Sequence, residues 1–500
     1  MLVLQVALGG IAAAQAQEPT APTERPLTYR EVLQAAIAGN GDLAVTEIAR
    51  DRAEAQVLGA NGLFDPLLQA SVGLDRSRSQ GFLNGFPYDS RRRAWQSDVT
   101  LSGVLGTGTD WSVSSGLSRN QSTFVTRDLG GDATRETDAF VAYTGVSLTQ
   151  QLLEGVRFRY NVQNVTLARQ ALDAAGLSVE KQRQDTLYAA AEAYWTWSYQ
   201  IQLHTIALDA VAVAEEALRV GNLQVERGQL APVEATRLEA ALVQARSDAL
   251  DARNAAEQAA NVVLLALGED PGEPIAPATE AGDVPDTTDI EADKAVAVAL
   301  EQNLDLALAR QQVETAGTVL DNAKHALLPS LAATLDAGVA SQRCPNDATD
   351  CSGGNALDAI SGLLSDENQP YVSVGGLLSV PLGNRAARGA RDVAAADVAL
   401  RDRQLQDTER LVAAAVEEQV RTLQSARQRM ELADANVRLA EETLRAEEAL
   451  AAAGRTIQKN VLEARTEVAR TRAEAAKART DTRLAQARLL ALQGQLSAEQ

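Results

Sequence analysis

The sequence predicts a mainly α-helical protein with a membrane β-barrel portion, and three observations support this fold class. Apolar and polar residues alternate after Pro66 and after Pro329, where two segments with helical periodicity end. Such alternation gives a strand one apolar and one polar face. The order of helix, strands and helices occurs twice along the chain. Long proline-free stretches rich in alanine, glutamate and arginine predict extended helices.

The composition argues against one thick globular core and against a nucleic-acid partner. Only 4% of the 500 residues are aromatic, and the 45% that are apolar include many alanines. Small side chains suit long helices that pack closely. The formal net charge of -21 would repel a phosphate backbone, so we expect no binding to nucleic acid.

Residues 1–16 are predicted to be a signal peptide for secretion. The apolar run LVLQVALGGIAAA is followed by Ala14, Gln15 and Ala16, which form a small-residue cleavage site. No basic segment precedes the run, and an N-terminal helix of the mature protein is the alternative. No other apolar run reaches the ~18 residues of a membrane-spanning helix, so any membrane crossing is expected to use strands.

A duplicated unit organises the remainder of the chain. Residues 40–68 align without a gap to residues 303–331, and similar correspondences link the later helical stretches. We expect strands at about 67–150 and at about 330–382, with a long helical hairpin after each set. The predicted parts are a first repeat at 17–267, a connector rich in proline and acidic residues at 268–293, and a second repeat at 294–500.

Pro66 and Pro329 are predicted to mark the junctions between helix and barrel, because proline ends a helix. Two strands from each repeat are too few to close a barrel, so several chains must pool their strands. Residues 99–118 look like a further hairpin, which either widens the barrel or folds outside it. Residues 81–94 and 342–369 are expected to form loops at the extracellular end.

The long helix of the second repeat has two apolar seams, each with a spacing of seven residues. A helix with two seams has two neighbours, which suits the wall of a tube. A solvated coiled coil with an imperfect second stripe is the alternative. The seams are formed by Leu432, Leu439, Ala446 and Ala453, and by Val437, Leu444 and Ala451.

The residues offer little support for an enzyme, a cofactor or a metal. Cys344 and Cys351 form either a local disulfide or two free thiols, and they have no histidine nearby to complete a metal site. His204 and His325 are expected to pack or to lie at an interface. The sequence contains no phosphate-binding loop, so any ATP hydrolysis must belong to a partner. The aromatic residues at 194–200 are interpreted as packing residues, with an aromatic ligand site as the alternative.

Several stretches in a duplicated order together resemble the TolC family of outer-membrane efflux channels. They include LLPSL at the second junction, VSLTQQLLEG before a long helix, and the paired stretches RGQLAPVEATR at 227–237 and GRTIQKNVLEAR at 454–465. The resemblance implies a homotrimer, with a β-barrel in the outer membrane that continues into an α-helical barrel through the periplasm. It also implies two partners, a periplasmic adaptor protein and an inner-membrane transporter.

The implied function is a passive duct that exports small molecules or polypeptides, in a tripartite efflux pump or a type I secretion system. The lining residues do not indicate which substrate is exported. The alternative is a structural periplasmic coiled-coil protein, or an adhesin with surface-exposed strands.

The resemblance further implies a gate at the two hairpin turns. Arg455 is similar to the arginine of a latch, Val233 and Glu234 to the positions that face it, and Asn460 and Glu463 to two constriction positions. Asn460 departs from the family pattern, because an amide replaces a carboxylate there. Alternatively, Arg455 and Glu234 are solvated charges, whose pairing contributes only about 0 to 1 kcal/mol.

Overall fold

The computed structural model describes most of the chain, and the chain forms two compact units. Of the residues that the structure describes, those within 1–47, 178–307 and 408–500 form the first unit, and those within 48–177 and 308–407 form the second unit. No helix in the described part is both long enough and apolar enough to cross a membrane. The described residues are 25–83, 85–128, 131–279, 291–345, 354–366, 368–453, 455–456 and 458–498.

Four helices run along the chain from one unit into the other. In the sequence, the division between the two units falls inside each of these helices. They are α2 (Gly41–Asn61), α4 (Gln163–Glu226), α7 (Leu304–His325) and α9 (Arg385–Ala452).

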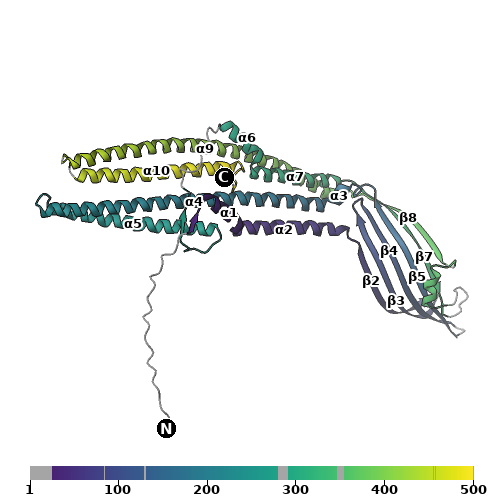
Figure 1. Cartoon of the computed structure of the whole chain (residues 1–500). Coiled ribbons are helices and arrows are strands. Elements are labelled where there is room, and N and C mark those ends of the chain that lie inside the picture. The colour runs from purple at the N-terminus through teal and green to yellow at the C-terminus, as the bar shows by residue number, and fades with distance from the viewer. Residues whose placement is uncertain are drawn as a thin grey trace, which may run out of the picture. The chain divides into compact units, whose positions relative to one another are not determined.

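The second unit contains one antiparallel six-stranded sheet with the order β2-β3-β4-β5-β7-β8 (Figure 1). Residues 99–118, whose place was left open by the sequence, belong to β3 and β4 and join this sheet. The first repeat therefore supplies four strands, and the expectation of two from each repeat is wrong. The strands are β2 (Leu67–Leu83), β3 (Phe86–Leu105), β4 (Thr109–Asp128), β5 (Gly131–Gln151), β7 (Ser330–Arg343) and β8 (Gln369–Ser379).

The connections between the first strands are tight. Leu83 pairs with Phe86, so the expected loop at 81–94 is wrong, because β2 and β3 extend into it. The turn between β3 and β4 depends on Gly108, which has a φ of 76° and donates its N–H to the Leu105 carbonyl at 2.9 Å. A Cβ atom at this position would lie 2.0 Å from the Gly155 carbonyl oxygen, so only glycine fits.

The sheet has two chemically different faces, because side chains alternate along every strand. We call them the apolar face and the polar face. One register row of the apolar face crosses all six strands as Val372, Ala337, Val146, Val113, Leu101 and Leu68. The neighbouring row of the polar face contains Ser373, Asp336, Ser147, Ser112 and Ser102, and ends at Leu67 of β2.

A short helix, α8 (Ala356–Gly362), lies on the apolar face. Its residue Ala359 is fully buried against Phe140 and Ala142 of β5. Cys344, directly after β7, is buried and disulfide-bonded. Cys351, the other half of the predicted pair, lies outside the described residues, so its pairing stays a prediction.

Each junction proline lies directly before a strand. Pro66 follows the 3₁₀ turn η1 (Gly62–Phe64) and precedes β2, and Pro329 follows α7 and precedes β7. Beside the second junction, His325 is buried and its ring contacts that of Tyr160, in α3 (Phe158–Asn161), with 4.8 Å between the ring centroids. His325 is therefore a packing residue, as the sequence predicted.

The first unit has its own core, formed where its two short strands meet the middle of α4. The strands β1 (Arg25–Leu27) and β6 (Ile275–Pro277) pair in parallel, and β6 lies within the predicted connector. The aromatic side chains of Tyr194, Trp195 and Trp197 are fully buried in this core. The other helices are α1 (Tyr29–Gly39), α5 (Pro232–Ala266), α6 (Ala292–Gln302) and α10 (Gln458–Leu492).

The aromatic side chains of this core are held by specific contacts, which favours the packing interpretation over a ligand site. The Tyr194 hydroxyl donates to the Thr279 carbonyl at 3.0 Å and accepts the Thr279 N–H at 2.9 Å. Tyr29 lies against Trp195, with 4.8 Å between ring centroids. Burial raises the pKa of Tyr29 to about 12.

We predict that Trp195→Ala destabilises the first unit by about 3 to 5 kcal/mol, because it removes a fully buried aromatic side chain and leaves a cavity. Chemical denaturation of the detergent-purified protein, followed by circular dichroism, measures the change. The control Glu192→Ala replaces an exposed residue of the same helix and should have little effect. Equal effects of the two variants would contradict the assigned core.

We predict that His325 makes the second unit less stable in acid. Burial, reinforced by the charge of Arg157, lowers the pKa of His325 below its ordinary value of 6.5. As the pH falls below about 6.5, the unfolded chain binds a proton that the folded chain resists, so stability decreases by at most about 1.4 kcal/mol per pH unit. Melting temperatures between pH 7.5 and 5 should fall more for the parent than for His325→Phe; parallel curves would refute the prediction.

Candidate functional site

Two helical hairpins of the first unit carry the predicted gate residues. One hairpin joins α4 to α5 and the other joins α9 to α10, and both turns lie at the same end of this unit (Figure 1). Ala231, with an extended backbone, precedes Pro232 at the first position of α5. Proline suits that position because its missing N–H needs no partner there.

A series of three ion pairs, which we call the charge ladder, joins α9 to α10. The pairs are Arg465–Glu448, Arg472–Glu441 and Arg479–Asp434, each with 2.8 Å between nitrogen and oxygen. The arginines are seven residues apart, and so are their partners. A spacing of seven keeps side chains on one side of a helix, so the ladder follows the antiparallel contact and defines its register.

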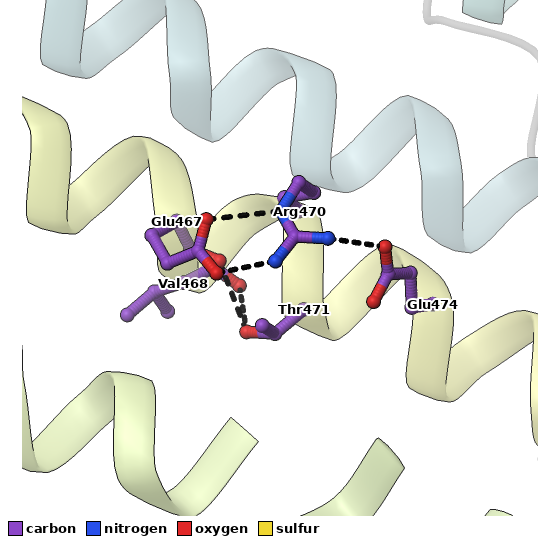
Figure 2. Close-up of polar contacts among 5 residues, drawn as sticks. All are labelled: Glu467, Val468, Arg470, Thr471 and Glu474. Carbon is purple, nitrogen blue, oxygen red and sulfur yellow. Dashed lines mark hydrogen bonds and ion pairs between the residues drawn. The ribbon is translucent and has the colours of Figure 1, made fainter. Parts of the chain in front are cut away.

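Further charges on α10 pair within the helix. Arg470 donates from Nε to Glu467 at 2.9 Å and from Nη1 to Glu474 at 2.5 Å (Figure 2). In the same view, the Thr471 hydroxyl donates to the carbonyls of Glu467 and Val468, at 3.0 and 3.1 Å. The Arg470 guanidinium lowers the pKa of the Glu467 carboxyl. These exposed contacts, one helical turn apart, support the helix rather than form a binding site.

The two predicted constriction residues lie near the start of α10 and have local partners. Asn460 donates from its amide to the Thr456 hydroxyl at 3.0 Å, and Thr456 donates to Glu447 of α9 at 2.9 Å. Glu463 is exposed and pairs with Lys459 one turn away, with 3.4 Å between the charged atoms. Lys459 was not singled out by the sequence analysis, although its spacing of four residues from Glu463 was visible there.

Among the described residues, no hydrogen bond or ion pair joins the Arg455 side chain to Val233 or Glu234. Glu234 pairs with Arg237 on its own helix at 2.7 Å, and Val233 is 58% exposed. The Arg455 side chain is exposed and forms no hydrogen bond or ion pair with any described residue. The predicted link between Arg455 and Glu234 therefore stays a prediction.

A groove of about 670 Å³ separates the two hairpins. The sequence analysis missed it, although the many alanines of α4 and α5 indicated where backbones could approach. Leu444, from one predicted seam, lines the groove, whereas Leu432 and Leu439, from the other, are 66% and 61% exposed. Other lining residues include Ala207, Ala210, Ala241 and Val468, and the ladder residue Arg472.

The described residues contain no group of three or more histidine, cysteine, aspartate or glutamate side chains arranged to hold a metal. His204 is half-buried on α4. The side chains at the hairpin turns are charged, amide and hydroxyl groups, which can attract or repel ions.

The sequence and the fold were compared with known proteins. Residues 295–495 match a family model described as outer membrane efflux protein. A search of the curated proteins gave no match. A membrane protein from Pseudomonas aeruginosa has a similar structure, with a TM-score of 0.65 and 16% identity over 94% of this chain and 91% of that chain.

Two solved outer membrane channels are also similar in fold. For CmeC of Campylobacter jejuni the TM-score is 0.63 and the identity 13%, over 94% of this chain and 87% of that chain. For the open state of MtrE of Neisseria gonorrhoeae the TM-score is 0.63 and the identity 14%, over 93% of this chain and 88% of that chain.

The fold similarity extends over both repeats, and the family match lies within the second. The predicted fold class is confirmed, because these channels share the combination of long helices and antiparallel strands. The sequence resemblance noted above is confirmed as well. The resemblance predicted a transport protein rather than an enzyme, and the description of the matched family agrees with a role in transport. Residues 295–495 are thus similar to the outer membrane efflux protein family, and the chain as a whole is similar in fold to solved outer membrane channels.

Proposed function

We propose that this outer membrane efflux channel works as a homotrimeric passive duct. Three six-stranded sheets close one barrel in the membrane, and the helical hairpins of three chains form a tube in the periplasm. The observation that carries the proposal is the sheet of the second unit, which has an apolar face, a polar face and two edges. Apolar residues outside and polar residues inside are typical of a membrane barrel around a water-filled lumen.

The two edges of the sheet support an assembly of several chains. In one chain, β2 and β8 each have a neighbouring strand on one side only. A bilayer core offers no water to the unpaired N–H and C=O groups of such strands, so an open sheet does not span it. Six strands are also fewer than the ~8 of the smallest barrels. Pairing β2 of one chain with β8 of the next satisfies both edges.

The helices of the first unit support the same assembly. Leu432 and Leu439 lie on α9 and are more than half exposed in the single chain. Their spacing of seven residues forms a stripe that another helix can cover. A helix of a neighbouring chain covers this stripe in the proposed tube, while Leu444 faces the groove within the chain.

The energy for export is proposed to come from partners. The sequence has no phosphate-binding loop, so the channel itself does not bind ATP in that way. A periplasmic adaptor protein connects the hairpin end to an inner-membrane transporter. The alternative is a structural coiled-coil protein or an adhesin. Neither gives a function to the polar face of the sheet, and the match to the efflux family model does not favour either.

The hairpin turns are proposed to form the gate. Three copies of Glu463 form a ring of like charges, three copies of Asn460 form an uncharged ring, and Arg455 of the latch faces Val233 and Glu234. The exposed, unbonded guanidinium of Arg455 supports this role, because it is free to reach a partner in an assembly. Lys459 reduces the negative charge of the Glu463 ring.

Outer-membrane fractions test the proposed function directly. We expect a heat-sensitive oligomer band that corresponds to a trimer, and conductance when the purified protein is added to planar bilayers. A monomeric protein that is released without detergent and does not conduct would contradict the proposal.

We predict that Leu335→Arg impairs assembly, because Leu335 lies on the apolar face and pairs across strands with Leu148 and Val374. A cationic side chain near the bilayer midplane costs roughly 2 to 4 kcal/mol per copy. The matched control is Thr334→Arg on the polar face, which should assemble and change conductance. The yield of the heat-sensitive oligomer measures assembly, and equal losses for both variants would refute the assigned faces.

We predict that divalent cations block the channel weakly, because Glu463 provides one carboxylate ring and Lys459 lies beside it. Asn460→Asp and Lys459→Gln should each strengthen the block, Glu463→Gln should abolish it, and Arg455→Ser should raise conductance. Single-channel recording with added Mg²⁺ measures these effects. Arg470→Gln, farther along α10, is the control. A gate elsewhere is indicated if all variants behave as the parent.

A further inference from the structure

Four arginines form a compact group on the apolar face of the sheet, which we call the arginine quartet. Arg76 of β2 pairs across strands with Arg93 of β3, and Arg78 pairs with Arg91. Positions two residues apart lie on the same face of a strand. The quartet therefore occupies two adjacent register rows of one face, and all four side chains are exposed.

The quartet has more positive charge than its neighbours neutralise. Asp89 accepts from Arg78 at 2.7 and 3.0 Å and from Arg91 at 3.3 Å. The guanidinium groups of Arg76 and Arg93 have no hydrogen bond or ion pair to any described residue. Like charges directly opposite one another destabilise a sheet. One carboxylate therefore neutralises part of the charge of four guanidinium groups, and the remaining positive charge favours binding of an anionic ligand.

Other charged groups on this face do not neutralise the excess. On the next strand, Arg119 pairs with Asp138 at 2.7 Å, so these two charges balance each other. Glu136 of β5 pairs in register with Thr123, which in turn pairs with Arg91, so it lies two strands from the quartet. Two strand spacings are about 10 Å, which is about one Debye length in 0.1 M salt.

The quartet begins where the apolar rows end. The row next to it contains Leu74 and Trp95, which pair across β2 and β3. Leu74 and Val72 are 87% and 80% exposed, and Leu68 is 68% exposed, all on the same face. An exposed apolar band followed by an exposed cationic row matches the chemistry of a lipid, with acyl chains below a charged headgroup.

The position of α8 independently supports a membrane boundary at this level. It packs on the same face over Phe140, whose row continues through Arg119 to Trp95. Its outer side exposes Leu357 at 75% and Ile360 at 47%, and Leu364 just beyond its end is 95% exposed. A short helix with one side on the protein and apolar side chains pointing outward is typical of the membrane interface.

We propose that the arginine quartet binds the phosphate-bearing headgroup of an anionic membrane lipid, whose acyl chains lie along the apolar band. This inference rests on the proposed function, since it needs the sheet to be in a membrane. Guanidinium groups form paired hydrogen bonds with phosphate oxygens, and the bound phosphate removes the repulsion between opposed arginines. A headgroup with its own cation, such as choline, neutralises its phosphate and fits less well.

Native mass spectrometry of the detergent-purified full chain tests the proposal with lipids of equal acyl chains. We expect phosphatidic acid to bind more tightly than phosphatidylcholine, and Arg76→Gln/Arg93→Gln to lose about tenfold or more of that affinity. The matched control is Arg92→Gln/Arg135→Gln, which removes two arginines from the polar face of β3 and β5 and should keep the parent's affinity. Equal affinity of the quartet variant and the parent would overturn the proposal.

Two further arms distinguish the source of the phosphate and the dependence on function. Inorganic phosphate at the same concentration should not displace the lipid; full displacement would mean a free-anion site and would overturn the proposal. Planar-bilayer conductance is measured for the same samples. A conducting parent without lipid preference refutes the lipid site alone, whereas a parent that neither conducts nor assembles refutes the proposed function.

Discussion

The two unsatisfied edges of the six-stranded sheet are the constraint on which the remainder of this structure depends. β2 and β8 each leave one row of backbone groups without a partner in the chain. Natural proteins rarely leave long edge strands open, because such strands pair with other chains. In the proposed trimer, identical chains complete one another at these edges. The duplicated chain thus supplies strands from both repeats to one sheet, and neither repeat is complete by itself.

Side chains alternate between the two faces of each strand, and this alternation determines on which face a charged residue lies. Leu335 and Thr334 are neighbours in sequence but lie on opposite faces of the sheet, so one strand contributes to both the apolar face and the polar face. The apolar face is not uniform, however, and changes from exposed leucine and valine to exposed arginine within two residues of β2. In the proposed membrane barrel, the apolar residues set the depth of the sheet in the bilayer, and the arginines lie at the boundary of the apolar band.

The fold class could be predicted from the sequence, because strand alternation and helical periodicity have different periods and both were visible beside Pro66 and Pro329. Four strands in the first repeat were harder to predict, since the serine-rich segments of β3 and β4 carry a weak apolar pattern. The gate residues came from a resemblance, and a single chain leaves them apart. The quartet was missed, because the pairing of β2 with β3 brings its arginines together and the sequence alone does not display that register. Lys459 was missed although its spacing of four residues from Glu463 on one helix was visible.

The charge ladder has a mechanical consequence for the hairpin of α9 and α10. Sliding one helix along the other by a single residue, about 1.5 Å, misaligns Arg465, Arg472 and Arg479 from their partners at the same time. Each pair contributes little alone, but all three resist shear together with the small side chains packed between the helices. The three pairs therefore couple α9 to α10, and we expect the two helices of the hairpin to move together rather than to slide past one another.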